Sequence, residues 1–322
     1  MREFLVIFLL ISNFAVGQST DFWHSYSTIS SFNPALTALD PAFRTTTLVS
    51  FRELSETGPV VGPVDTSNHK FSFFHGAEFQ LPKGQIGVGV YARSIMLENQ
   101  FEILQGDVQF SKHYPLKKHT LSVGLMISAG AIKSPIFNTD NVYQPQSQEP
   151  IEGRGYFDIG AGGAFTGKNG GIGISMINFI DENKDAQVRE PARQIIVHGN
   201  YIHFGDTYKH GGSTVVSIGR EREIQEHFSL FRFYNNYTLG YERFQMHLGS
   251  LLQRLVKPTE KGANYLHDLS VGLGILTHWF SLNYTAGFPF EKHLERKTTH
   301  NLSMKWRIGK EKELEKALFY TL

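Results

Sequence analysis

Apolar side chains recur at every second position in segment after segment of this chain. At the odd positions from 121 to 131 the sequence reads Leu, Val, Leu, Ile, Ala and Ala, while the positions between them include Ser, Gly, Ser and Gly. Residues 71–79, 86–93, 268–275 and 301–308 show the same alternation. Successive side chains of a β-strand point to opposite faces, so this period predicts strands with one apolar face and one of glycine, serine or charge.

Alternation alone also fits a soluble β-sandwich, but the connections between the segments favour a different architecture. Outer-membrane barrels have tight periplasmic turns and longer extracellular loops, and about 9 to 11 tilted residues cross the bilayer. The expected strands are about that long, and over the first eight of them long and short links alternate. The short links are 82–84, 114–118 and 167–170, and the long ones are 53–67, 134–152, 181–192 and 251–263.

The sequence therefore predicts an all-β chain, a transmembrane outer-membrane β-barrel of about 14 antiparallel strands. An even number is typical of single-chain bacterial barrels. The stretch 213–249 alternates least cleanly, so 12 and 16 strands stay open. The expected strands are 43–52, 69–80, 85–94, 101–112, 119–132, 155–166, 171–180, 193–204, 213–219, 227–233, 238–249, 266–276, 277–287 and 299–308.

The ends of the chain differ from the expected barrel, 43–308. Residues 1–17 resemble a secretory signal peptide, because Arg2 precedes an apolar run that is too short to span a bilayer and a small-residue cleavage site follows. Residues 18–42 form an N-terminal periplasmic or plug segment, and 309–322 a charged C-terminal tail. No later stretch is long and apolar enough to predict a transmembrane helix.

Composition excludes several functions. The formal charge is +1, from 31 basic and 30 acidic residues, which argues against a nucleic-acid partner. Cysteine is absent, so there is no disulfide, thiolate metal site or cysteine nucleophile.

The motifs associated with catalysis or cofactors are incomplete. Gly162–Lys168 begins like a phosphate-binding loop, but Asn169 follows where Ser or Thr is needed, and a strand follows in place of a helix. Residues 181–185 begin like a calcium loop, but Ala186 replaces its glycine. We therefore expect no catalytic residues, no cofactor and no metal, and keep an outer-membrane phospholipase or protease only as the enzyme alternative.

The segment before the first strand is the best candidate for a specific role. Trp23, Tyr26 and Phe32 need a surface to cover, and the Asn33-Pro34 and Asp40-Pro41 pairs predict local turns. That surface is either the inner barrel wall or a periplasmic subunit. Inward-facing glycines either let a segment approach the wall or only let the sheet curve. They are Gly87, Gly89, Gly160, Gly162, Gly171, Gly173, Gly272 and Gly274.

Several motifs resemble those of the PorP/SprF family of Bacteroidota outer-membrane proteins. Asn33-Pro34-Ala35, Asp40-Pro41-Ala42-Phe43-Arg44 and Phe51-Arg52 resemble its N-terminal signature, and 156–162, 171–175 and 299–303 resemble later strands. The chain departs from the family in having Asp40 where a second Asn-Pro-Ala is usual, and in its charged tail. The candidate partner-binding residues are Trp23, Tyr26, Phe32, Asn33, Pro34, Asp40, Pro41, Arg44 and Arg52.

The resemblance implies a non-enzymatic component of the type IX secretion system in the cell outer membrane. It would support secretion or surface attachment of cargo proteins, gliding adhesins among them, through protein–protein interaction. Its partners would be outer-membrane lipid, secretion components or cargo, and a periplasmic peptidoglycan-linked subunit. A passive pore or hydrophobic-solute transporter is the alternative function.

Overall fold

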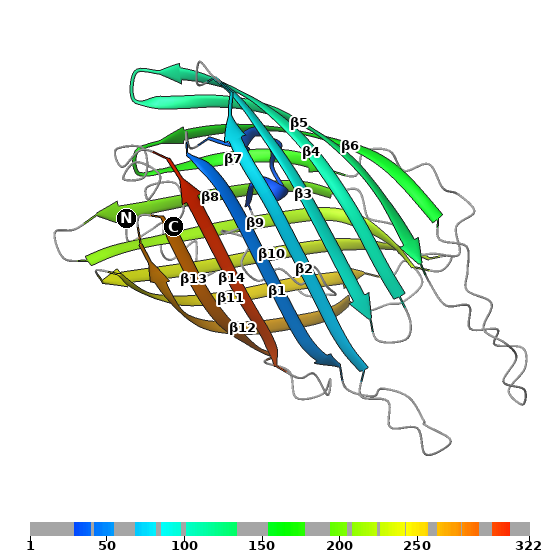
Figure 1. The fold of residues 1–322 in the computed structure, drawn as a ribbon. Helices are drawn as coiled ribbons and strands as arrows, with labels where there is room; N and C mark the ends of the chain where they lie inside the picture. Colours follow the sequence, from blue (N-terminus) through cyan, green and yellow to red (C-terminus); the bar gives the residue numbers. More distant parts are fainter. Residues whose placement is uncertain are drawn as a thin grey trace, which may run out of the picture.

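The computed structural model is a closed barrel of fourteen antiparallel strands (Figure 1). The structure describes residues 29–39, 42–54, 68–81, 85–97, 101–133, 154–177, 194–204, 208–223, 226–241, 243–256, 263–277, 279–289 and 298–309. No helix among these residues is long and apolar enough to cross a membrane. The prediction of an all-β outer-membrane barrel of about 14 strands is confirmed.

Each strand pairs with its neighbours in sequence, and the first strand pairs with the last. This closing pair joins Phe43 to Ile308 and continues to Arg52 and Thr299, so the sheet has no open edge. The strands are β1 (Phe43–Leu54), β2 (Asn68–Gln80), β3 (Ile86–Leu97), β4 (Phe101–Leu116), β5 (His119–Lys133), β6 (Arg154–Gly167), β7 (Gly170–Ile177), β8 (Gln194–Phe204), β9 (Tyr208–Glu223), β10 (Glu226–Tyr241), β11 (Phe244–Val256), β12 (Ala263–Leu276), β13 (Phe280–Pro289) and β14 (Thr299–Ile308).

The two faces of the barrel wall differ as the alternation predicts. On β5, Leu125 is 64% exposed on the outside, whereas its neighbour Met126 is 2% exposed inside. The outer face carries Leu, Ile, Val and aromatic side chains, which suit contact with lipid. The inner face carries mostly glycine and small or charged polar residues.

The connections agree only in part with the expected pattern. At the end of the barrel where β1 begins, every link between strands is short. At the other end, long links occur at 55–67, 134–153 and 178–193, but 98–100 and 224–225 are short. Four expected links are shorter than predicted, because the strands beside them extend further. The links 53–67, 114–118, 167–170 and 251–263 become 55–67, 117–118, 168–169 and 257–262.

One predicted strand, 238–249, is wrong, although the total number of strands is right. It is divided between β10, which ends at Tyr241, and β11, which begins at Phe244. The outward apolar residues shift there from odd positions, such as Tyr241, to even ones, such as Phe244 and Met246. The alternation of apolar and polar residues is weak nearby because Tyr234 and Leu251 make the inner face apolar as well.

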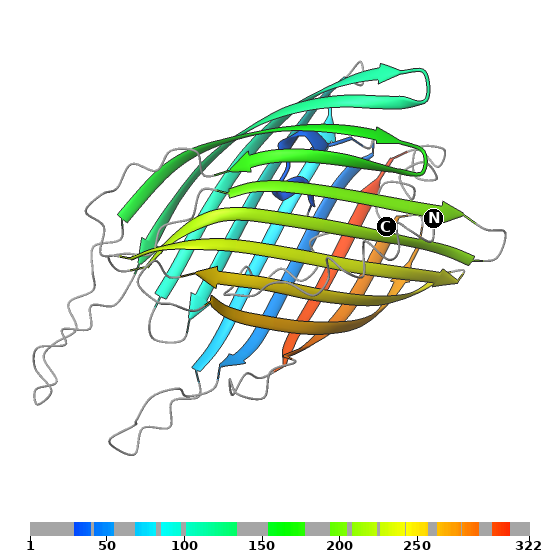
Figure 2. The same cartoon turned by 180° about the vertical axis from the view of Figure 1, so that it is seen from behind.

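A short segment before β1 lies inside the barrel, as two opposite views show (Figures 1 and 2). It contains two single-turn 3₁₀ helices, η1 (Ile29–Ser31) and η2 (Pro34–Leu36). We call Ile29–Leu39 the lumenal segment.

Candidate functional site inside the barrel

Local chemistry shapes the centre of the lumenal segment. Asn33 is the N-cap of η2, and its Oδ1 accepts a hydrogen bond from the Ala35 amide at 3.0 Å. Pro34 occupies the first helical position, where its missing N–H costs nothing. The Thr37 amide then donates to the Pro34 carbonyl at 3.2 Å. These bonds turn the chain back on itself before β1.

Asn33 also connects the segment to strands far along the sequence. Its Nδ2 donates to the Gly163 carbonyl of β6 at 3.2 Å and lies 2.8 Å from Nε2 of His198 on β8. Ser175 on β7 donates from its Oγ to the Phe32 carbonyl at 2.7 Å. Buried polar groups are stable only with such partners, so the centre of the segment is fixed to the wall of β6 to β8.

A second set of hydrogen bonds holds the C-terminal end of the segment against β2 and β4. Thr37 donates from its Oγ1 to Gln109 at 2.6 Å, and the Thr37 carbonyl accepts from Ser111 at 2.7 Å. Gln80 donates to the Ala38 carbonyl at 2.9 Å. The contacts of the centre and of this end together therefore span the inner wall from β2 to β8.

Glu78 on β2 is the charged anchor of the segment. Its carboxylate is buried and accepts hydrogen bonds from Ser30 Oγ at 2.6 Å and from the Ala38 amide at 2.8 Å. The same group pairs with Arg44 of β1 at 2.5 Å. Charge-assisted bonds are stronger than neutral ones, so this carboxylate joins both ends of the segment to the start of the barrel.

Inward glycines create the space that the segment occupies. A Cβ at Gly124 would collide with the backbone of Pro34 and Ala35, and one at Gly162 would collide with Asn33 Oδ1. At Gly89 it would meet Thr37 Cγ2 at 2.7 Å, and at Gly173 it would meet Asn33 Nδ2, also at 2.7 Å. Gly87 similarly faces the Thr37 carbonyl. These glycines permit close approach of the segment.

The remaining glycines proposed from the sequence have different neighbours. A Cβ at Gly160 would meet Met126, and one at Gly171 would meet Thr166. Gly272 and Gly274 face Thr285 and Asn283 of β13. They therefore accommodate side chains of the wall itself. The sequence analysis also missed Gly124, whose contact with the segment is among the tightest.

The structure brings together only some of the predicted partner-binding residues. Phe32, Asn33, Pro34 and Arg44 gather in the lumen, and Arg52 lies on β1 opposite Thr299 of β14. Trp23, Tyr26, Asp40 and Pro41 lie outside the described residues.

Sequence reasoning missed the wall residues that bind the segment, above all Glu78, Gln109 and His198. Glu78 is the one carboxylate within β2, and it falls on the inward side of the alternation. That position was a usable signal of a buried charge in need of a partner.

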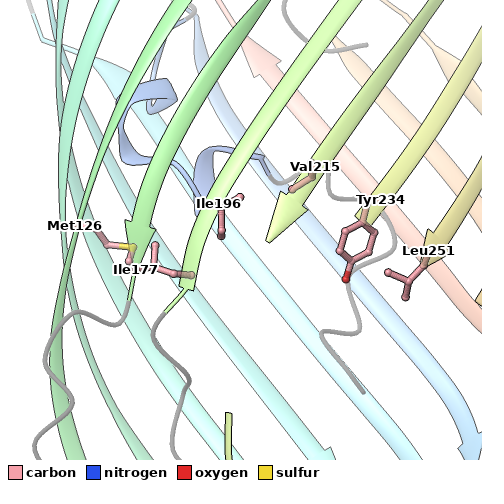
Figure 3. Packing of buried hydrophobic residues seen from close by; sticks show 6 residues of the cluster. All are labelled: Met126, Ile177, Ile196, Val215, Tyr234 and Leu251. Atoms are coloured by element: carbon pink, nitrogen blue, oxygen red, sulfur yellow. The ribbon is translucent and has the colours of Figure 1, made fainter. Parts of the chain in front are cut away.

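An apolar surface also faces the lumen, which the sequence analysis did not predict. It lies on β5 and on the consecutive strands β7 to β11 (Figure 3). Phe32 of the lumenal segment packs against it. We call this set the inner apolar cluster: Met126, Ile177, Ile196, Val215, Tyr234 and Leu251.

The motif that begins like a phosphate-binding loop belongs to a β-hairpin. Gly162–Gly167 ends β6 and joins β7 through a turn at 168–169, as a hairpin does. Within the described ranges, no group of three His, Asp or Glu side chains could hold a metal ion. The calcium-like stretch 181–185 is outside those ranges.

The fold and the occupied lumen define a class of protein, the outer-membrane β-barrel with an N-terminal segment inside. The family of type IX secretion system membrane proteins PorP/SprF matches residues 25–306. The chain belongs to this family, and it is a protein of the bacterial outer membrane. The resemblance seen in the sequence is confirmed. No curated protein matches the chain.

Solved outer-membrane barrels are similar in fold. The TodX ΔS2 mutant, a monoaromatic hydrocarbon channel, has a TM-score of 0.53 and 9% identity over 86% of this chain and 93% of its own. CymD, another such channel, has a TM-score of 0.52 and 9% identity over 92% of this chain and 95% of its own. The toluene transporter TbuX of Ralstonia pickettii has a TM-score of 0.50 and 9% identity over 88% of this chain and 94% of its own. Sequence identities this low support a similar fold and no shared function.

Proposed function

We propose that this protein is a plugged, non-enzymatic barrel that supports secretion or surface attachment of cargo proteins by the type IX system. It acts through protein–protein contacts, and gliding adhesins are among the proposed cargo. The proposed partners are outer-membrane lipid, other secretion components or cargo, and a periplasmic peptidoglycan-linked subunit. Membership of the PorP/SprF family supports the secretion role.

The binding of the lumenal segment is the observation that carries the proposal. Its contacts reach from β2 to β8, and a buried carboxylate, a carboxamide and an imidazole of the wall all bind it. A conducting pore needs an open, hydrated lumen. A wall shaped around a segment of its own chain suits a barrel that presents surfaces to other proteins.

The proposed organisation of the chain follows from this function. Residues 1–17 are a signal peptide that export removes, 18–42 form the plug segment, 43–308 the barrel, and 309–322 a periplasmic tail. Both the start of β1 and the end of β14 lie at the short-turn end of the barrel, which is the periplasmic end in this family of folds.

Replacement of Asn33–Pro41 by a Gly/Ser linker tests the role of the segment in the native bacterium. Surface display of secreted cargo should fall, while heat-modifiable migration of the barrel on gels is retained. Normal display at normal expression would overturn the proposed role. Loss of the barrel itself would show that the segment acts in folding, and not in secretion.

A hydrophobic-solute transporter is the second candidate, because the inner apolar cluster is a surface on which an apolar solute could bind. Planar-bilayer conductance of the pure protein separates an open pore from a plugged barrel. Silence supports the plugged barrel, and a stable open channel would overturn it. Co-purification in mild detergent from the native bacterium would then identify the partner.

A further inference from the structure

The inner apolar cluster lies on a barrel face where polar residues are usual. Its six side chains come from six strands, and their exposed fractions lie between 2% and 8%. Apolar side chains of adjacent strands lie close enough to form one continuous surface (Figure 3). Such a surface gains free energy when an apolar group covers it.

Gln253 lies at the edge of this surface and needs hydrogen-bond partners. It lies two positions after Leu251 on β11, so both side chains project from the inner face. Gln253 is 1% exposed, and neither atom of its carboxamide has a hydrogen-bond partner in the described part of the chain. A buried amide without partners is costly, so the occupant must offer hydrogen-bonding groups beside apolar ones. A polypeptide meets both needs, whereas a hydrocarbon meets only one.

The lumenal segment contacts the opposite edge of the same surface through Phe32. Phe32 packs against the cluster, and the bond from Ser175 to its carbonyl fixes the backbone there. The chain that precedes Ile29 therefore enters the lumen next to Ser30, which donates to Glu78 of β2 and lies two residues before the contact of Phe32 with the cluster. After removal of residues 1–17, it consists of residues 18–28.

We propose that residues 18–28 continue the lumenal segment along the inner wall of β8 to β11, with Trp23 and Tyr26 on the inner apolar cluster. The length is sufficient. The cluster extends from β5 to β11, six strand spacings of about 4.8 Å, or roughly 29 Å in all. Eleven extended residues reach roughly 36 to 40 Å.

The composition of residues 18–28 complements the wall. Phe22, Trp23 and Tyr26 supply aromatic surface, and Asp21 is the one Asp, Glu, Lys or Arg of the segment. Its serines and threonines, Ser19, Thr20, Ser25, Ser27 and Thr28, together with its backbone amides, supply partners for Gln253. Aromatic rings bury large areas at little conformational cost, so two or three of them account for much of the apolar cover.

The inference extends the proposed plug, but it does not depend on the secretion role. A barrel that conducts although this contact is intact would overturn the proposed function alone. A silent barrel in which the contact is missing would overturn this inference alone.

Engineered cysteines test the contact in the full-length exported protein, because the wild type has none. In the double variant Trp23→Cys with Leu251→Cys, mild oxidation should form an intramolecular disulfide. The matched control joins Trp23→Cys to Leu48→Cys, a buried inner residue of β1 outside the cluster, and should not form one. Heat-modifiable migration verifies folding. If Leu251→Cys prevents it, Tyr26→Cys with Val215→Cys replaces that pair.

Maleimide labelling of the single variant Leu251→Cys gives a second measurement. Labelling should be about tenfold slower in the full chain than in a chain whose exported form lacks residues 18–28. Equal rates together with no intramolecular disulfide would overturn the inference. So would disulfide-linked dimers, which assign the surface to a second copy, or protection that appears only when toluene is added, which assigns it to a free aromatic solute.

Discussion

The inner wall of β3 to β7 and the inner wall of β11 and β12 are both rich in glycine, yet the two regions use it differently. In the first region a segment of the same chain occupies the space above Gly89, Gly124 and Gly162. In the second, the space above Gly272 and Gly274 holds Thr285 and Asn283 of the adjacent strand. An inward glycine therefore marks a binding surface only where the neighbouring strand leaves its space empty.

Loss of the charged anchor should give the largest difference between the regions. Glu78→Ala removes the acceptor of Ser30 and Ala38 and leaves Arg44 without this partner, so the free energy of unfolding should fall by about 3 to 5 kcal/mol. Chymotrypsin should then cut after Phe32 in the folded barrel, which mass spectrometry detects.

Asp107→Ala is the matched control for the anchor. It breaks another buried ion pair, Arg93 to Asp107 at 2.8 Å, and among the described residues no hydrogen bond joins either side chain to Ile29–Leu39. Stability should fall in this variant also, but Phe32 should stay protected. Cleavage in both variants would mean that any loss of stability releases the segment.

The outer faces of the two regions should respond alike, because lipid covers both. Leu125→Arg on β5 and Leu273→Arg on β12 place a charge at positions that are 64% and 66% exposed outside, and each should cost roughly 2 to 4 kcal/mol. Folding yield into lipid vesicles, read by heat-modifiable migration, measures the effect. A Leu125→Arg protein that folds as well as the wild type would contradict the lipid-facing assignment.

Adding one methyl group tests the two kinds of glycine directly. Gly124→Ala forces Cβ against the Pro34 backbone, which should cost about 1 to 3 kcal/mol and expose Phe32 to protease. Gly249→Ala, on the inner face of β11, meets the movable Ser270 hydroxyl instead and should leave Phe32 protected. Equal protection of Phe32 in both variants would remove the distinction between the regions.

The smallest effect is expected at the cap of η2. Asn33→Ala removes the bond to the Ala35 amide and the bond to the Gly163 carbonyl, so stability should fall by about 1 to 2 kcal/mol. Asn283→Ala on β13, the strand beside the second region, removes a contact with His247 of β11 at 3.1 Å. Urea unfolding should register both changes, but only Asn33→Ala should increase cleavage after Phe32.

The sequence was sufficient for the features that depend on neighbouring residues. Alternation in β5 and β14 identified strands and their lipid face, because side-chain direction in a strand depends only on position along it. The same logic failed at β10 and β11, where Tyr234 and Leu251 make both faces apolar. Strand boundaries there depend on what fills the lumen.

The candidate site was harder to predict because its contacts join distant residues. Aromatic residues and prolines indicated that the segment before β1 has a surface to cover, but not which one. Its partners Glu78 and His198 are separated from it by tens of residues or more, and His198 lies 165 positions after Asn33. Period and composition carry no information about contacts at that distance.

The distant hydrogen-bond partners of Asn33 constrain the order in which the barrel folds. Its partners lie 130 to 165 residues ahead, so the environment of this side chain is complete only after β6, β7 and β8 have paired. Contacts between residues far apart in sequence require long loops to close first, which makes them slow to form. The beginning of the chain is therefore among the last parts to reach its native position. The time at which it becomes resistant to protease therefore indicates when the first eight strands have assembled.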